Sequence, residues 1–223
     1  MQMIQLDLQE LPVFRDVPAA EINRFIEETG AVIKRYEKGC RVLKAYEPNG
    51  SIGVIAAGEA QVLSEDRFGN EAISHGLERG AMLGSTSAIL PEVAYTMTIE
   101  ALTDVLILWV PYQALLTAGP KLGRTHGIVM KNLLEAFCWK NLLMMQKIEL
   151  LSQKTLRERL ILYLLQREQR QDRERVYVPG RVQLAKELEC NRSALTREIG
   201  AMRSNGMLLC GVGWMQLDKD KIG

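Results

Sequence analysis

The chain has 223 residues, of which 47% are hydrophobic and 25% are charged. These are ordinary values for a globular protein, so the composition excludes a disordered or a fibrous class. The length suits two domains better than one. No apolar run approaches the roughly 18 residues that span a bilayer, and Met1 to Glu10 lacks the basic and apolar blocks of a signal peptide. We therefore expect a cytoplasmic protein without a membrane partner.

Charge is distributed unevenly along the chain. Residues 1–150 carry 14 Lys and Arg against 18 Asp and Glu, a net charge of −4, whereas residues 151–223 carry 14 against 9, a net charge of +5. A basic carboxy-terminal third predicts that only this part faces a polyanion such as DNA. The alternative is a chance scatter of surface charge.

The first third of the chain predicts a β-rich domain. Residues 21–29 form a short helical pattern with Ile22, Phe25 and Ile26 on one face. Between residues 31 and 110, short apolar stretches are separated by turn signals at Lys38-Gly39, Pro48-Asn49-Gly50, Ala57-Gly58, Phe68-Gly69-Asn70 and Arg79-Gly80. Turns about every ten residues indicate an antiparallel sandwich or jelly roll. Met97 to Ala101 alternates like a half-buried strand, and Val105 to Val110 is apolar throughout, like a strand buried on both faces.

From about Pro120 the pattern becomes helical for more than thirty residues. A 4-3-4-3-4-3 spacing joins Met130, Leu134, Phe137, Asn141, Met144, Ile148 and Leu151. Such an a/d seam predicts two helices that wind together in a homodimer, with Asn141 as a polar residue that fixes their register. The alternative is one long helix packed on its own sandwich. Cys138, beside the seam, could form an inter-subunit disulfide, but a buried free thiol is more common.

The basic third begins after a break at Leu151-Ser152, where Ser152 is the expected N-cap of a helix at residues 155–169. A strand follows at residues 175–179. Next come a short helix from Val182 to Leu188, a corner at Glu189-Cys190-Asn191 and a second helix from Arg192, which together predict a helix-turn-helix. Ala185 is small where the two helices cross, and the expected core positions are Leu184, Leu188, Leu195, Ile199 and Met202.

The second of these helices has a polar face that predicts DNA reading. That face carries Arg192, Ser193, Thr196 and Arg197, and Asn191 is expected to cap the helix. Arginine binds guanine in a bidentate manner, and serine or threonine contacts bases or phosphates. A hairpin of residues 207–209 and 214–217, with its turn at Gly211-Val212-Gly213, would be the wing. The alternative is an ordinary solvated polar face.

Several motifs, in this order, resemble the Crp/Fnr superfamily of bacterial regulators over nearly the whole chain. The segments are Leu11-Pro-Val-Phe14, Tyr36-Glu-Lys-Gly39, Gly53 to Gly58, Asp66-Arg-Phe-Gly-Asn70, Gly84 and Asn191 to Arg197. Residues 140–142 and 146–152 resemble members common in anaerobic Gram-positive bacteria. In contrast, Glu189 stands where many such corners have glycine.

The resemblance implies an α+β fold in three parts. These are a cyclic-nucleotide-binding-type β jelly roll at residues 1–119, a long dimerisation helix at residues 120–151 and a C-terminal winged helix-turn-helix at residues 152–223. It further implies a homodimeric transcription regulator that binds a two-fold-related operator in double-stranded DNA and contacts RNA polymerase.

Members that bind cAMP hold the ribose with a glutamate after a glycine, and the cyclic phosphate with an arginine that precedes Ser or Thr. Counted from Gly84, this chain has Ser85 for the glutamate, Tyr95 for the arginine and Thr96 for the hydroxyl. Loss of the arginine costs roughly 1 to 5 kcal/mol, so we expect no useful cAMP binding.

We expect a different, unidentified small effector of apolar or aromatic character. Its pocket would be lined by Ser85, Thr86, Tyr95, Thr96, Asn141, Met144 and Met145. The alternative is that Met144 and Met145 are core and seam residues and that side chains fill the pocket.

Other chemistries are not favoured. Residues 1–39 contain no cysteine for an iron-sulfur cluster, and Cys40, Cys138, Cys190 and Cys210 lack zinc-site spacing, so we expect reduced thiols and no metal. His75 and His126 are expected to be ordinary residues rather than haem ligands. A cupin-like enzyme needs several histidines in one barrel, and the strand-rich region has only His75. A jelly-roll ligand-binding regulatory protein without DNA binding remains as an alternative that leaves the helix-turn-helix unexplained.

Overall fold

The computed structural model describes residues 7–65, 71–93 and 96–222. The chain divides into two compact units, residues 1–136 and 137–223, and the division falls within the long helix α5 (Arg124–Ser152). Within the described ranges, no helix combines the length and the apolarity needed to cross a membrane.

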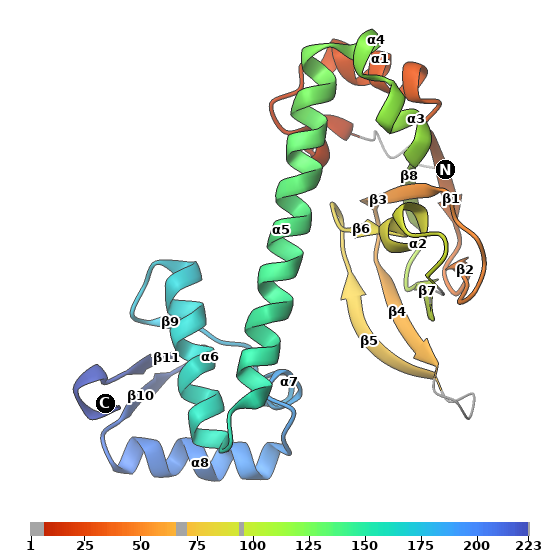
Figure 1. Cartoon of the computed structure of the whole chain (residues 1–223). Helices are drawn as coiled ribbons and strands as arrows, with labels where there is room; N and C mark the ends of the chain where they lie inside the picture. Colours follow the sequence, from red (N-terminus) through yellow and green to blue (C-terminus); the bar gives the residue numbers. More distant parts are fainter. Residues whose placement is uncertain (1–6, 66–70, 94–95, 223) are drawn as a thin grey trace. The chain divides into compact units, whose positions relative to one another are not determined.

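Two four-stranded antiparallel sheets form the centre of the first unit (Figure 1). Their strand orders are β1-β8-β3-β6 and β2-β7-β4-β5. The strands are β1 (Val32–Tyr36), β2 (Arg41–Leu43), β3 (Ser51–Ala57), β4 (Ala60–Glu65), β5 (Glu71–Leu77), β6 (Met82–Leu83), β7 (Met97–Ala101) and β8 (Val105–Pro111). The predicted β jelly roll is therefore confirmed.

Strand β8 has an apolar core on each of its faces. Val105, Ile107 and Trp109 belong to the core between the two sheets. Leu108 and Val110 point to the opposite side and belong to a second core beneath a layer of helices. Because successive strand residues face opposite sides, a strand between two cores has to be apolar at every position, as the sequence predicts.

The helical layer of the first unit covers the outer face of the sheet that contains β8. Its members are η1 (Leu8–Glu10), η2 (Pro12–Phe14), α1 (Ala19–Thr29), α3 (Tyr112–Thr117), α4 (Gly119–Leu122) and the first part of α5. The rings of Phe14 and Phe25 meet edge to face at 5.4 Å. Val129 and Leu133 of α5 are buried in this core. The alternative of a long helix packed on its own sandwich is thus correct for this stretch of α5.

The predicted turn at Ala57-Gly58 joins β3 to β4 and requires glycine. Gly58 has a φ of +82°, and a Cβ at this position would lie 2.2 Å from the carbonyl oxygen of Asp104. The predicted turn at Phe68-Gly69-Asn70, and with it the motif at residues 66–70, lies outside the described residues.

The second unit combines the end of α5 with further helices and a small sheet. These elements are α6 (Leu156–Gln171), β9 (Val176–Tyr177), α7 (Arg181–Glu187), α8 (Arg192–Ser204), β10 (Leu208–Gly211), β11 (Trp214–Leu217) and η3 (Lys219–Lys221). The sheet has the order β10-β11-β9. All five predicted core positions of the helix pair are buried, and Leu150 of α5 and Leu160 of α6 join them in one core.

The predicted N-cap at Ser152 is wrong. Ser152 is the last residue of α5, and its hydroxyl donates to the carbonyl of Glu149 at 2.7 Å. Thr155 caps α6 instead: its Oγ1 accepts from the N–H of Glu158, and its own N–H donates to the Glu158 carboxylate at 2.8 Å. The reason is that a capping box needs Glu or Gln three residues after the cap. Thr155 has Glu158 there, whereas Ser152 has Thr155.

Candidate functional site

The corner between α7 and α8 has the predicted position. Its first residue, Glu189, has a φ of +49°, in the left-handed region that glycine favours. The N–H of Glu189 donates to the carbonyl of Lys186 at 3.2 Å, and the N–H of Cys190 donates to that of Ala185 at 3.0 Å. The corner therefore forms with glutamate in place of glycine. Burial raises the pKa of the Cys190 thiol, which keeps it protonated.

Asn191 starts α8 as an N-cap, as predicted. Its Oδ1 accepts from the N–H of Ala194 at 2.7 Å and from the hydroxyl of Ser193 at 2.9 Å. An N-cap of this kind satisfies a backbone donor that has no partner within the helix. The first turn of α8 is thereby held in shape.

Helix α8 has one buried and one exposed face. Leu195, Ile199 and Met202 are buried in the core of the second unit. The four predicted reading residues, Arg192, Ser193, Thr196 and Arg197, are all exposed. The hydroxyl of Thr196 donates to the carbonyl of Arg192 at 2.8 Å, which leaves the oxygen's lone pairs for an outside donor. The structure thus brings the predicted residues together on one face.

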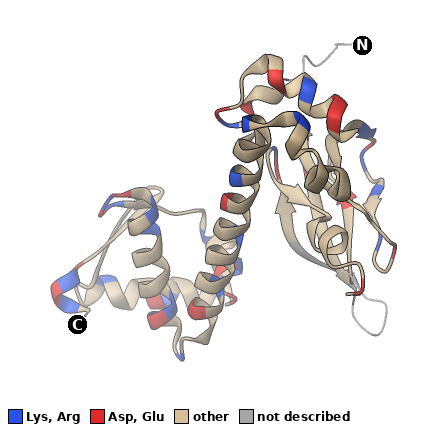
Figure 2. Ribbon diagram, turned by 45° about the horizontal axis from the view of Figure 1, so that its top comes forward, with Lys and Arg blue, Asp and Glu red and all other residues tan. Residues whose placement is uncertain are grey.

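The two arginines on this face have no carboxylate partner among the described residues. By contrast, Arg157 of α6 donates to Glu198 of α8 at 2.6 Å, and Arg167 of α6 lies 3.1 Å from the carboxylate of Glu187. In Figure 2, Lys and Arg recur along the helices of the second unit together with Asp and Glu. The guanidinium groups of Arg192 and Arg197 are therefore free to bind an outside acceptor in a bidentate manner.

Three residues that hold the end of α7 by hydrogen bonds were not predicted from the sequence. Lys147 of α5 donates to the carbonyl of Glu187, and Arg159 of α6 donates to that of Leu188. Tyr163 donates to the carboxylate of Glu187. No sequence signal identifies them, because each partner is at least 24 residues away along the chain.

The hairpin after α8 is tighter than predicted. Gly211 pairs with Trp214, so Gly211 belongs to the strand and only Val212 and Gly213 form the turn. Gly213 has a φ of +73°, in the left-handed region that glycine favours. The guanidinium of Arg175 lies over the ring of Trp214 at 5.0 Å.

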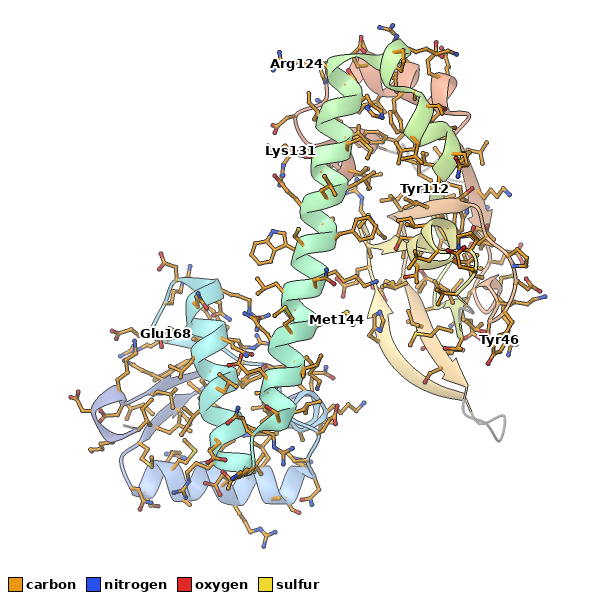
Figure 3. All side chains as sticks on the ribbon, viewed as in Figure 1. Tyr46, Tyr112, Arg124, Lys131, Met144 and Glu168 are labelled. Atoms are coloured by element: carbon orange, nitrogen blue, oxygen red, sulfur yellow. The ribbon has the colours of Figure 1, made fainter. Side chains whose placement is uncertain are left out.

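The predicted seam on α5 is largely exposed within the single chain. Leu134, Met144 and Ile148 are 60%, 56% and 67% exposed, and Asn141 is exposed as well. Met130, Phe137 and Leu151 are half-buried. Figure 3 shows the side chain of Met144 projecting from α5. A helix with apolar residues of this size in contact with water is typical of an interaction site.

The residues predicted to form the effector pocket fall into three groups. Ser85 begins the short helix α2 (Ser85–Ile89) and is buried, whereas Thr86 and Thr96 are exposed. Met144 and Met145 are exposed, so they are not core residues of the single chain, and their alternative place in the seam stays a prediction. Tyr95 lies outside the described residues.

The turn before α2 is fixed by Asn49. The Nδ2 of Asn49 donates to the carbonyls of Ser51 at 2.8 Å and Gly84 at 2.9 Å. Gly84 has a φ of +67°, and a Cβ there would lie 2.7 Å from the same Nδ2. Glycine is therefore required where the resemblance places the start of the nucleotide cassette.

The histidines and cysteines occupy different environments. His75 lies on β5, and Nε2 of His126 in α5 is 2.8 Å from the carbonyl oxygen of Leu115. The expectation that Cys138 is buried is wrong, because its side chain is exposed. It lies one position after the half-buried Phe137 on α5.

Residues 33–118 match the family of cyclic nucleotide-binding domains. The matched range includes α2 and the stretch from Gly84 to Ala101, which contains neither lysine nor arginine. This stretch therefore offers no basic side chain to a cyclic phosphate. No curated protein sequence matches the chain.

The similarity to solved structures covers most of the chain, well beyond residues 33–118. CprK complexed with OCPA has a TM-score of 0.62 at 12% identity, with 90% of each chain covered. The Thermus thermophilus catabolite activator protein has a TM-score of 0.53 at 19% identity, with 93% of this chain and 94% of that one covered. A protein from Eubacterium rectale, described as a transcriptional regulator of the Crp/Fnr family, has a TM-score of 0.50 at 18% identity, with 93% of each chain covered. At the level of the fold, the chain is therefore similar to Crp/Fnr regulators, as the resemblance implies.

Proposed function

We propose that the protein is a homodimeric, sequence-specific DNA-binding transcription regulator of the Crp/Fnr type, and not an enzyme. In this proposal, residues 1–119 are the sensor, residues 120–151 the dimerisation helix and residues 152–223 a winged helix-turn-helix. A cytoplasmic location, a two-fold-related operator and contact with RNA polymerase belong to the same proposal.

The observation that carries the proposal is the exposed face of α8. Arg192 and Arg197 are exposed on the helix whose Leu195 and Ile199 are buried, and neither arginine is paired with a carboxylate among the described residues. A helix anchored by one face and bearing free guanidinium groups on the other fits the major groove. The alternative of a ligand-binding protein without DNA binding leaves this face unexplained.

Dimerisation would present two such faces to the operator. The exposed seam on α5 favours dimerisation, because burial of apolar side chains such as Leu134 and Ile148 between two paired helices lowers the free energy. Two recognition helices related by two-fold symmetry would then reach half-sites about 34 Å apart. Asn141 would fix the register of the pair.

The sensor is proposed to respond to an effector other than cAMP. Support comes from the stretch after Gly84, which lacks the basic residue that a cyclic phosphate requires. The proposed lining remains Ser85, Thr86, Tyr95, Thr96, Asn141, Met144 and Met145, and the effector would shift the population of DNA-binding conformations.

The test is selection of bound sequences from a random double-stranded DNA pool by the full-length protein, followed by fluorescence anisotropy on the enriched sequence. We expect an enriched sequence with two-fold symmetry, bound at least about a thousandfold more tightly than a scrambled one. A pool that shows no enrichment, with affinity independent of sequence, would contradict the proposal.

A further inference from the structure

The C-terminal end of α7 is held by cations from two other helices. The last carbonyls of a helix lack partners within it, and they carry the partial negative charge of the helix dipole. Lys147 of α5 donates to the carbonyl of Glu187 at 2.6 Å, and Arg159 of α6 donates to the carbonyl of Leu188 at 2.9 Å. The position of α7 is thus fixed relative to both helices, immediately before the corner that leads into α8.

Lys147 also contacts the corner itself. Its Nζ lies 3.4 Å from Oε1 of Glu189, the residue at a φ of +49°. Glycine would adopt this backbone conformation more easily. The glutamate thus adds a carboxylate that points back to α5, so one ammonium group bridges the last turn of α7 and the corner.

Among the described residues, the other side-chain hydrogen bonds between this part of α5 and another helix go to α6 and not to α7. Leu150 is buried in the core of the second unit, and Gln166 of α6 donates to the carbonyl of Gln146 at 3.2 Å. Apolar burial holds two helices together without fixing their angle closely. The two contacts of Lys147, each with a defined direction, restrict the rotation of the helix pair about α5.

We propose that Lys147 is a positioning residue that fixes the angle between α5 and the reading helix α8, with Glu189 as its acceptor at the corner. This inference rests on the proposed function, because it concerns how α8 is presented to DNA. In a dimer, a fixed angle limits the distances between half-sites that both reading helices can reach together. Lys147 therefore determines the preferred half-site spacing without contacting a base.

The experiment compares the full-length wild type with Lys147→Met, Lys147→Arg and Glu189→Gly. Fluorescence anisotropy gives the affinity for the selected operator and for versions with the half-sites one or two base pairs closer or farther apart. Methionine keeps much of the aliphatic stem of Lys147 and removes its charge, whereas arginine keeps the charge. Glycine removes only the ion pair and suits the φ of the corner, so this variant is expected to fold.

We expect Lys147→Met to reduce the affinity ratio between the best and worst spacings by about tenfold, with the base preference inside each half-site unchanged. Lys147→Arg should restore the ratio, and Glu189→Gly should reduce it in part. A change of base preference together with spacing preference would overturn the positioning role, because it would indicate a general loss of structure.

Hydrogen exchange provides a readout that does not depend on DNA. In Lys147→Met, the amides of Glu189 and Cys190, which donate to Lys186 and Ala185, should exchange faster than in the wild type. If spacing preference and exchange both match the wild type, the role of Lys147 is overturned while DNA binding stands. If the wild type itself shows no sequence preference, both the proposed function and this inference are overturned.

Discussion

The hydroxyl of Tyr163 donates a hydrogen bond of 2.6 Å to Oε2 of Glu187, which joins α6 to α7. Nη2 of Arg167 lies 3.1 Å from the same oxygen, and its guanidinium group lies 4.8 Å from the centre of the Tyr163 ring. Burial, together with the bond to Glu187, raises the pKa of Tyr163, so the phenol stays protonated as the donor. The three side chains hold α7 against α6.

Tyr163→Phe tests the strength of this contact. We expect the free energy of opening of α7 to fall by about 1 to 2 kcal/mol, since the lost bond goes to a charged acceptor and Arg167 still pairs with Glu187. Native-state hydrogen exchange at the amides of Leu184 and Leu188 measures this change. Exchange rates equal to those of the wild type would show that the bond does not stabilise α7.

The same cluster predicts a dependence on pH. Burial acts to raise the pKa of Glu187, but hydrogen bonds from Tyr163 and the charge of Arg167 outweigh it, so the pKa is lowered. A lowered pKa in the folded state means that the carboxylate stabilises the protein above its unfolded value of about 4.3, and that this stabilisation is lost as the pH falls through the folded pKa. We expect α7 to be stable from neutral pH to about pH 5 and to open more readily below it.

The control for the pH dependence is Glu187→Gln, which cannot titrate at this position. Hydrogen exchange of α7 measured across the acidic range should change less with pH in this variant than in the wild type. An equal dependence in both proteins would assign the effect to other carboxylates.

Arg197→Ala tests the reading face. We expect sequence-specific binding to be abolished, because each half-site loses a bidentate contact worth about 1 to 3 kcal/mol, while the mass of the dimer stays the same. Arg170→Ala removes the same charge from α6 and serves as the matched control. Anisotropy titrations with the selected and the scrambled DNA measure both. An unchanged sequence preference in Arg197→Ala would show that the reading face is misplaced.

A pair of leucines on α5 tests the dimer seam. Leu134 belongs to the seam, and Leu143 is on another face; they are 60% and 45% exposed. Leu134→Glu would place two carboxylates in an apolar interface, at a cost of several kcal/mol per pair, so we expect a monomer by sedimentation equilibrium. Leu143→Glu should remain a dimer. A dimer in both variants, or a monomeric wild type, would contradict the seam.

Addition of cAMP tests the sensor. We expect no heat of binding by calorimetry and no change in operator affinity at millimolar cAMP, because the stretch from Gly84 to Ala101 offers no cation to the phosphate. The Thermus thermophilus catabolite activator protein, whose fold is similar, can be titrated in parallel as a comparison. Binding in the micromolar range would mean that residues elsewhere supply the charge.

Local periodicity accounts for the elements that the sequence predicts correctly. Strand β8 is apolar throughout because it separates two cores, and α8 has an apolar stripe because one of its faces is buried. The cap at Asn191 follows from the residue type directly before the helix. The N-cap of α6 shows the limit of such reasoning, since both Ser152 and Thr155 are suitable residues and only the position of Glu158 distinguishes them.

The order and type of the elements, the apolar repeat on α5 and the buried and polar faces of α8 were determined by the sequence itself, because a repeat in residue type reports which face of an element is buried. The contacts that fix these elements relative to one another were decided by the tertiary structure. Lys147 meets Glu187 across 40 residues of sequence, and Asn49 meets Gly84 across 35. No repeat in the sequence signals such pairs. Their geometry arises only when separate elements pack and each buried polar group meets its partner.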